Sequence, residues 1–306
     1  MPVLYFFESI RQPWLDKIML VITELGNEIP FMALAIVIFW CISKQIGYFM
    51  LSSGFIGTIA TQWMKLIFRV SRPWVQDPGF TIVEAAREGA GGYSFPSGHT
   101  QSAASTLGVP AVSVKQRWLS IVLWALFILV GISRMYLGVH TPLDVGVAFA
   151  LGLLLIFLMR PVFRSGDPKR MYILLAILTL IAVAYVIYTN FYPFPADIEA
   201  ENLEEGVKNG FTLLGAIAGM LLAYWLDDHY IHFSVEGSLP AQIVKAVVGL
   251  GLLIAIRSVL KSPLNALFNG SYAANAVRYF VMVVFAGAVW PMTFPFICRL
   301  LPPKKK

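Results

Sequence analysis

His140 and Asp144 are the residues of this 306-residue chain whose types and spacing best suit nucleophilic chemistry. They stand four positions apart in the segment SRMYLGVHTPLD, residues 133–144, and the Thr-Pro pair between them predicts the start of a helix. One helical turn can bring the aspartate against the imidazole, which fixes the ring tautomer and leaves the other ring nitrogen free to attack. Arg134 adds a cation at the end of the preceding apolar stretch. Taken alone, His140 could equally be a satisfied loop histidine and Asp144 a residue that favours the helix dipole.

Three cations precede a proline in the segment KLIFRVSRP, residues 65–73. Lys65, Arg69 and Arg72 stand at offsets of zero, four and seven, which places them on one face of a helix. We expect Pro73 to stop that helix. Long basic side chains at a membrane boundary can snorkel to the interface, or they can clamp the oxygens of an anion. The spacing alone leaves both interpretations open.

A third cluster, YSFPSGHTQS over residues 93–102, precedes an apolar stretch of small residues. Ser97 and Gly98 at a helix N-terminus would present a hydroxyl and backbone N–H groups to an anion, supported by the helix dipole. Gly98 would also let the backbone approach a phosphate closely. His99 would lie beside that anion, although a plain capped turn would use the same residues.

Together the three clusters predict phosphoryl transfer. The chain has four histidines, two of them in these clusters, and all three clusters stand at the ends of apolar stretches on one predicted face. Cations, backbone donors, histidines and an aspartate that converge there match the needs of that reaction. No carboxylate cluster indicates a metal, so we expect guanidinium and ammonium groups to neutralise the phosphate, without a metal or cofactor. Cys41 and Cys298, both in apolar stretches, predict neither a disulfide nor a metal site.

The order of the motifs resembles the three-part signature of the type 2 phosphatidic acid phosphatase superfamily. The chain has Lys-six residues-Arg-Pro, then Pro-Ser-Gly-His, then Ser-Arg-five residues-His-three residues-Asp, all within roughly residues 30–160. Every position of the signature is filled. The resemblance implies that the phosphate oxygens are bound by Lys65, Arg72, Ser97, Gly98 and Arg134.

The resemblance also implies a role for each catalytic residue. His140 attacks phosphorus and forms a phosphohistidine, Asp144 orients His140, and His99 protonates the leaving group and then activates water. Arg69 is outside the family pattern, and we retain it as a secondary candidate on geometry alone. Because the two histidines need opposite protonation states, we expect a bell-shaped pH profile.

Composition predicts that these motifs are positioned by membrane helices. Hydrophobic residues make up 58% of the chain and charged residues 13%, against roughly 25% charged in a soluble domain. Several stretches run to about 20 apolar residues, enough to cross a bilayer core. We predict an all-α polytopic membrane bundle of about eight or nine transmembrane helices, around the core that the family shares with vanadium-dependent haloperoxidases. The expected spans are 30–48, 49–70, 99–114, 118–138, 142–160, 170–190, 209–227, 240–260 and 276–298.

Three regions and an orientation follow from this arrangement. We expect residues 1–28 to form an interfacial or partly inserted helix, 29–165 the phosphatase core, and 166–306 additional spans. The long loop 72–98 and the acidic loop 191–208, which includes Asp197, fall on one face. The opposite face collects basic residues, which marks the cytoplasmic side: Lys44, Lys115, Arg117, Arg160, Arg164, Lys169, Arg170, Lys304, Lys305 and Lys306. We expect an integral protein of the bacterial cytoplasmic membrane whose active site faces outward.

The substrate is less constrained than the chemistry. A site at the bilayer edge favours a lipid phosphate monoester whose chains stay in hydrocarbon. Undecaprenyl pyrophosphate is equally compatible with that geometry, and a sugar phosphate such as glucose-6-phosphate is a further alternative. The extended layout is loosely similar to sphingosine-1-phosphate phosphatases and glucose-6-phosphatases, a likeness that does not identify the substrate. A non-enzymatic lipid transporter or scaffold is the third hypothesis. We expect as partners the lipid phosphate or isoprenoid pyrophosphate substrate and membrane lipids, and no nucleic acid, with the oligomeric state open.

A second group of titratable residues lies in the C-terminal half, on the predicted opposite face. It comprises Asp227, Asp228, His229 and His232. The His-x-x-His spacing with nearby acids hints at a metal, but a solvated loop accounts for the same residues and is the interpretation we favour.

Overall fold

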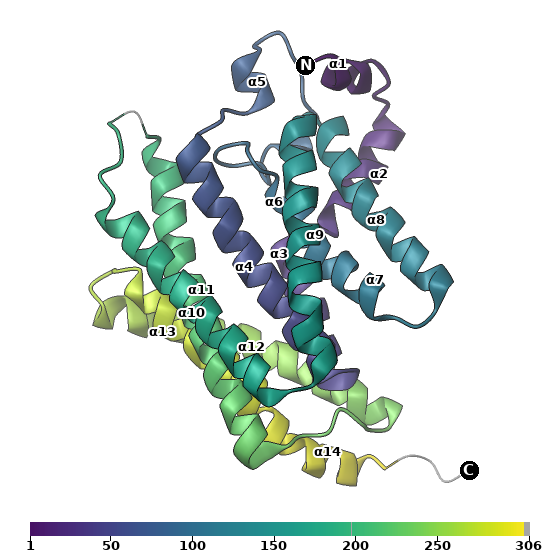
Figure 1. Cartoon of the computed structure of the whole chain (residues 1–306), viewed down its shortest axis with the longest axis vertical. Coiled ribbons are helices and arrows are strands. Elements are labelled where there is room, and N and C mark those ends of the chain that lie inside the picture. The colour runs from purple at the N-terminus through teal and green to yellow at the C-terminus, as the bar shows by residue number, and fades with distance from the viewer. Residues whose placement is uncertain (197, 303–306) are drawn as a thin grey trace. The chain divides into compact units, whose positions relative to one another are not determined.

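The computed structural model describes residues 1–196 and 198–302, and these residues form helices and connecting loops without a strand (Figure 1). Asp197, Lys304, Lys305 and Lys306, which entered the prediction of loop charge and topology, lie outside the described residues. The chain divides into two compact units. Helices α3, Glu28–Cys41, α4, Lys44–Phe68, α9, Pro142–Ser165, and α11, Ala200–Leu226, each contribute residues to both units.

The first unit comprises Met1–Met32, Phe49–Pro161 and Phe194–Gly206, and contains the three clusters predicted to carry phosphoryl transfer. Besides parts of α3, α4, α9 and α11, its helices are α1, Pro2–Ser9, α2, Pro13–Glu24, α5, Pro73–Gln76, α6, Gly98–Ala103, α7, Val109–Ser113, and α8, Arg117–Tyr136. Helices α1, α2, α6 and α7 all pack against α8, and Figure 1 shows α2 running beside it. The N-terminal residues therefore belong to the same packed unit as the motifs.

Small residues in the segment Gly98–Ser113 form the centre of this unit. Helices α6 and α7 are joined through a π-helical turn, Ala104–Gly108, and almost all of the segment is buried. A Cβ atom at Gly152 would lie 2.4 Å from the Cβ of Ala104, and one at Gly57 would overlap the side chain of Gln101. Glycine at these positions lets α9 and α4 approach the segment closely, as small residues do between membrane helices.

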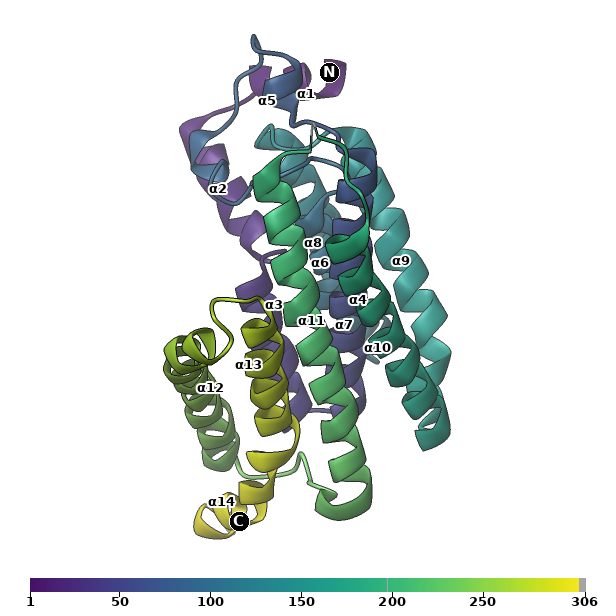
Figure 2. The same ribbon diagram turned by 90° about the vertical axis from the view of Figure 1, so that its left-hand side faces the viewer.

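The second unit comprises Ala33–Tyr48, Val162–Pro193 and the chain from Val207 onward. Its helices include α10, Pro168–Phe191, α12, Leu239–Leu267, α13, Ala273–Val284, and α14, Phe294–Leu300. Helices α12 and α13 lie side by side, as Figure 2 shows. Two indole hydrogen bonds to backbone carbonyls join its segments, from Trp40 to Ala286 at 2.7 Å and from Trp290 to Lys245 at 3.0 Å.

In the part of the chain that the structure describes, six helical stretches are long and apolar enough to cross a membrane: Arg117–Tyr136, Pro142–Ser165, Pro168–Phe191, Ala200–Ile231, Leu239–Leu267 and Ala273–Leu300. Helices α2 and α3, bent by 47°, make a seventh if they form one broken span. Large apolar side chains are exposed on these helices, with Leu180 68% and Leu239 74% accessible, as expected of surfaces that face lipid. The chain is an integral membrane protein with an all-α polytopic fold.

Two predicted boundaries differ from the structure. The break predicted at residues 48 and 49 lies inside α4, and the helices instead part near Ser43, whose hydroxyl accepts a hydrogen bond from the Ile46 N–H at 3.3 Å. The stretch 99–114 was predicted as a membrane span, but it is the buried segment of α6 and α7. These two helices are short, and the segment is not one of the six candidate membrane spans.

Candidate active site

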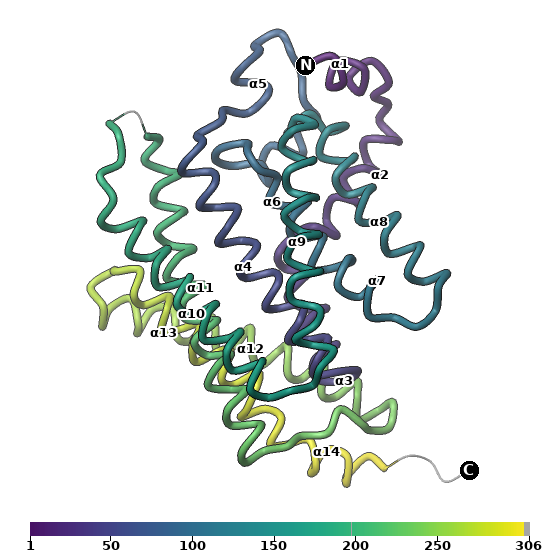
Figure 3. The backbone as a smooth tube through the Cα atoms, in the orientation of Figure 1, coloured from purple at the N-terminus to yellow at the C-terminus, as the bar shows by residue number. Residues whose placement is uncertain are grey.

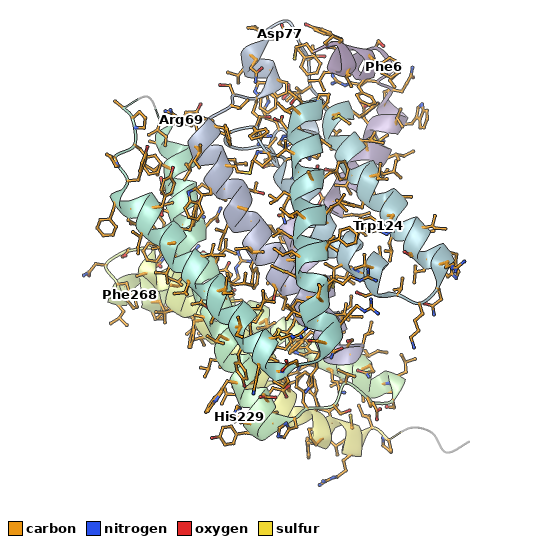
Figure 4. The ribbon with its side chains drawn as sticks, viewed as in Figure 1. Phe6, Arg69, Asp77, Trp124, His229 and Phe268 are labelled. Carbon is orange, nitrogen blue, oxygen red and sulfur yellow. The ribbon has the colours of Figure 1, made fainter. Side chains whose placement is uncertain are left out.

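The cationic segment leaves α4 earlier than its spacing predicts. Helix α4 ends at Phe68, and Arg69, labelled at the end of α4 in Figure 4, has a left-handed backbone with φ of 50°. Arg72 is extended, with φ −68° and ψ 154°, because the ring of a following proline disfavours helical backbone. Pro73 begins α5, the first helical position being one that proline favours. The prediction that Lys65, Arg69 and Arg72 share one helix face ending at Pro73 is therefore wrong.

The connection from α4 to α6 runs through α5 and past the N-terminal helices before it returns to α6 (Figure 3), and the N-terminal helices anchor it. The hydroxyl of Tyr5 donates to Asp77 at 2.7 Å, and the Arg11 guanidinium donates to the carbonyls of Thr81 and Tyr136 at 2.8 and 3.0 Å. These contacts fix the outer part of the connection. Its inner part, residues 89–97, lies against the predicted catalytic residues.

His140 and Asp144 meet as their spacing predicts. His140 Nδ1 lies 3.5 Å from Asp144 Oδ2, and both side chains are at most 2% exposed. The Asp144 carboxylate accepts the Thr141 N–H at 2.7 Å, and Thr141 Oγ1 accepts the Asp144 N–H at 3.2 Å. This reciprocal pair is a capping box at the start of α9, so the N-terminus of the helix itself holds the aspartate in place.

Ser94 completes this cluster and was not among the predicted site residues. Its hydroxyl donates to Asp144 Oδ2 at 2.6 Å and lies 3.4 Å from His140 Nδ1. The Ser94 side chain is fully buried. It was missed because its partners are 46 and 50 positions away, and nothing about a serine three residues before Ser97 indicates them.

Arg72 contacts the other nitrogen of the same ring. Its Nη1 lies 2.9 Å from His140 Nε2, and its remaining hydrogen bonds go to the carbonyls of Val139 at 3.0 Å, Gly91 at 2.6 Å and Gly92 at 2.8 Å. A guanidinium can only donate, so Nε2 is the acceptor and a neutral ring carries its proton on Nδ1, toward Ser94 and Asp144. The lone pair suited to attack is thus on Nε2.

Electrostatics keep this imidazole neutral. Burial, together with the positive charges of Arg72 and Arg134, holds the pKa of His140 well below its usual range. Burial also lowers the pKa of Arg72, to about 10, which leaves the guanidinium charged at neutral pH. The arrangement combines a neutral nucleophile with a fixed cation beside it, which suits attack on an anionic phosphorus centre.

Arg134 offers unsatisfied donors inside the site. It is 1% exposed, donates from Nη1 to Thr23 Oγ1 at 2.8 Å, and has only a long contact from Nη2 to the Gly89 carbonyl at 3.4 Å. Its Nε is buried without a hydrogen-bond partner among the described residues. A buried guanidinium with free donors is costly unless an anion binds it. Lys65 lies in the last turn of α4 and is partly buried.

Ser97 and Gly98 lie at the N-terminus of a helix, as predicted, while their contact with an anion stays a prediction. Ser97 caps α6, and its Oγ accepts from the Thr100 N–H and hydroxyl at 3.4 and 2.9 Å. Gly98 begins α6, and a Cβ atom there would meet no atom within 4 Å. His99 follows, with its Nε2 3.9 Å from the position of a Cβ at Gly89. Gly89 therefore lies between His99 and Arg134.

A pocket of about 260 Å³ opens beside Arg72. Its lining includes Ser71, Trp74, Arg87, Tyr93 and Glu199. The guanidinium groups of Arg72 and Arg87 lie over the Trp74 ring. Their Cζ atoms are 5.9 and 5.3 Å, respectively, from the ring centroid. Within residues 1–196 and 198–302, no group of three or more His, Cys, Asp or Glu side chains is placed to hold a metal ion.

Comparisons with known proteins match both halves of the chain. A family model described as the PAP2 superfamily matches residues 42–166, and one described as a PAP2 superfamily phosphatase, transmembrane extension, matches residues 211–299. Phosphatidylglycerophosphatase B of Bacillus subtilis (strain 168) is 32% identical over 160 residues, 49% of this chain and 76% of that protein. Undecaprenyl-diphosphatase of Sulfolobus acidocaldarius is 28% identical over 160 residues, 51% of this chain and 74% of that protein. No solved structure matches the chain significantly.

Proposed function

Because this chain belongs to the PAP2 superfamily and is an integral membrane phosphatase, we propose that it hydrolyses a lipid phosphate monoester through a phosphohistidine formed on His140. One observation carries the proposal: His140 Nε2 accepts from Arg72 at 2.9 Å while Nδ1 faces Asp144. This geometry supports a neutral imidazole whose attacking nitrogen already lies beside a cation able to bind the phosphate oxygens.

The first step transfers the phosphoryl group to the protein. His140 Nε2 attacks phosphorus, the bond from phosphorus to the lipid oxygen breaks, and that electron pair leaves with the oxygen, which takes a proton from His99. Lys65, Arg72 and Arg134 stabilise the charge on the equatorial oxygens of phosphorus. To attack, Nε2 must give up its hydrogen bond to Arg72, whose Nη1 can then donate to a phosphate oxygen.

The second step regenerates the enzyme. Water attacks phosphorus and gives a proton to His99, the phosphorus–nitrogen bond breaks, and its electron pair returns to Nε2 as inorganic phosphate leaves. Asp144 and Ser94 hold the Nδ1 side of the ring during both steps and stabilise the positive charge that the phosphorylated imidazole carries. The fixed cations of the site neutralise the phosphate, so the proposed reaction requires no metal ion.

Two relatives support a lipid substrate. The Bacillus subtilis protein is named for a phosphatidylglycerophosphate, and the Sulfolobus acidocaldarius protein for an undecaprenyl diphosphate. Both names describe a phosphate carried on a long apolar group, which suits a membrane-embedded enzyme. The second name makes an isoprenoid diphosphate our alternative substrate. We further propose that the site faces outward from a bacterial cytoplasmic membrane, on the charge asymmetry of the loops.

A substrate panel tests the proposal. The full chain is purified in detergent with a chelator present, and phosphate release is compared for phosphatidylglycerophosphate, phosphatidic acid, undecaprenyl diphosphate and glucose-6-phosphate. We expect kcat/KM to be highest for a lipid monoester. A preference for glucose-6-phosphate overturns the lipid assignment, and activity that requires an added divalent metal overturns the metal-independent chemistry. Alkaline quenching during turnover should trap a base-stable, acid-labile phosphoprotein in the wild type.

A further inference from the structure

The first turn of α11 packs onto the glycine-rich part of the active-site connection. Asn202 Oδ1 accepts the Tyr93 N–H at 3.1 Å, and the Tyr93 hydroxyl accepts the Glu199 N–H at 3.2 Å. The Asn202 amide also donates to the Glu199 carboxylate. All three residues belong to the first unit, and the segment 194–206 lies between the two stretches that the family models match.

The fit between Asn202 and the connection is tight and buried. Asn202 is 7% and Tyr93 5% exposed. Gly92 has φ of 68°, a left-handed conformation, and a Cβ atom there would lie 2.3 Å from Asn202 Oδ1. The position therefore requires glycine on two counts, and the absent side chain lets the asparagine oxygen reach the next backbone N–H.

Two carbonyls connect this contact to the reacting nitrogen. Gly91 and Gly92, immediately before Tyr93, give their carbonyl oxygens to Arg72 at 2.6 and 2.8 Å. The same guanidinium lies 2.9 Å from His140 Nε2. Asn202 thus fixes the backbone whose carbonyls orient Arg72, and Arg72 in turn sets the position of the cation beside the nucleophile.

We propose that Asn202 is a positioning residue for catalysis, which holds Gly91 and Gly92 so that Arg72 is aligned with His140. This inference rests on the proposed function of His140 and Arg72. It assigns to the segment between the two family matches a part in the reaction, acting through the backbone and without contact to the substrate. Misplacement of such a group by about 1 Å can cost on the order of 100-fold in rate.

The expected effect is on turnover more than on substrate binding. Asn202→Ala leaves the Tyr93 N–H without its acceptor and frees the loop, so Arg72 and His140 lose their mutual alignment. We expect kcat to fall by about 10- to 100-fold, with KM within about threefold, because Asn202 is proposed to act through the backbone and not through contact with the substrate. Glu201→Ala is the matched control, since Glu201 is exposed on the same turn, and we expect its kcat within about twofold of wild type.

A double substitution distinguishes positioning from general support of the fold. Asn202→Asp alone places a carboxylate against Glu199, which should lower kcat by repulsion. Combined with Glu199→Gln, the aspartate can accept from both the Tyr93 N–H and the new amide, so we expect kcat to recover to within about fivefold of wild type. Wild-type kcat per folded molecule in Asn202→Ala, or a double variant no better than Asn202→Ala, overturns the proposal.

Hydrogen exchange separates this inference from the proposed function. In Asn202→Ala, and not in Glu201→Ala, we expect faster amide exchange in the peptide that spans residues 89–94. If wild type releases no phosphate from any ester, the proposed function fails, and the positioning of Arg72 is then read from binding of inorganic phosphate to the same variants. Unchanged exchange or unchanged phosphate affinity in Asn202→Ala overturns the inference.

Discussion

Two histidine–aspartate pairs occur among the described residues, one in each unit, and they have nearly the same separation. His140 Nδ1 lies 3.5 Å from Asp144 Oδ2, and His229 Nδ1 lies 3.8 Å from Asp228 Oδ2. A hydroxyl contacts each aspartate, from Ser94 at 2.6 Å and from Tyr172 at 2.9 Å. By atom types and distances, the pairs are hard to tell apart.

Their surroundings differ. The side chains of His140 and Asp144 are 2% and 1% exposed, whereas those of His229 and Asp228 are 48% and 31% exposed. Nδ1 of His229 lies 3.0 Å from the carbonyl of Trp225 one turn earlier, while His140 has a guanidinium at Nε2. Water can solvate an exposed pair, so it needs no ligand, but buried cations without enough acceptors favour a bound anion. Burial and neighbouring cations, more than the pair itself, indicate a catalytic site.

Substitution of the two histidines should separate the pairs by the largest margin. His140→Ala removes the proposed nucleophile, and we expect kcat to fall by about 10⁴-fold or more, with no phosphoprotein trapped on alkaline quenching. His229→Ala removes a half-exposed ring and should leave kcat within about twofold. Both are measured as phosphate release per folded molecule. Full activity in His140→Ala, or equal losses in both variants, would break the distinction drawn between the pairs.

Removal of the hydroxyl that each aspartate accepts should give a smaller difference. Ser94→Ala takes a hydrogen bond from a buried carboxylate, an interaction of about 1.5–3 kcal/mol, so we expect kcat/KM to fall by about 10- to 100-fold. Tyr172→Phe deletes the matching hydroxyl beside Asp228 and should not change kcat/KM measurably. If the two variants behave alike, the Ser94 hydroxyl has no part in orienting His140.

The proximity of His140 and Asp144 and the membrane helices could be predicted from the sequence, because both depend on local patterns. The pair follows from a four-residue spacing at a helix start, and helices α8 and α10 follow from apolar runs that end near the observed boundaries. The break between α3 and α4 was misplaced, although the polar residues Ser43, Lys44 and Gln45 interrupt the apolar run at the observed break. Ser43, which caps α4, is a polar signal that could have located it.

The rest of the site depends on contacts between distant segments. Ser94, Thr23 and Asn202 act on residues 50, 111 and 109 positions away, and single serine, threonine or asparagine residues have no pattern that predicts such partners. Arg72 was predicted at the site but in a helix, whereas its backbone is extended. The prediction gave the spacing of the cations more weight than the effect of Pro73 on the residue before it. Whether Arg69 contributes stays a prediction.

The pH dependence of turnover should give the smallest effect and sharpen the comparison most directly. His140 must be unprotonated to attack, and its pKa lies well below the usual value near 6.5. Besides burial, the charges of Arg72, Arg134 and Lys65 lower the pKa of His140, and His99 acts in the same direction. The Asp144 carboxylate faces Nδ1 at 3.5 Å, and its negative charge opposes them. A lowered pKa means that the neutral ring persists as pH falls, so its activity is lost only once pH falls through that lowered value.

We therefore expect kcat/KM to fall by no more than about twofold between pH 7.5 and 6.5 on the acid side of a bell-shaped profile. The second ionisation of the substrate, near pH 6, also contributes, so the profile is measured with an alkyl and an aryl phosphate whose ionisations differ. If the acid limb of the profile shifts with the pKa of the substrate phosphate, that limb reports ionisation of the substrate. If the acid limb stays near pH 6.5 with both substrates, it would report a histidine whose pKa is close to that of an exposed imidazole. Burial would then no longer distinguish His140 from His229.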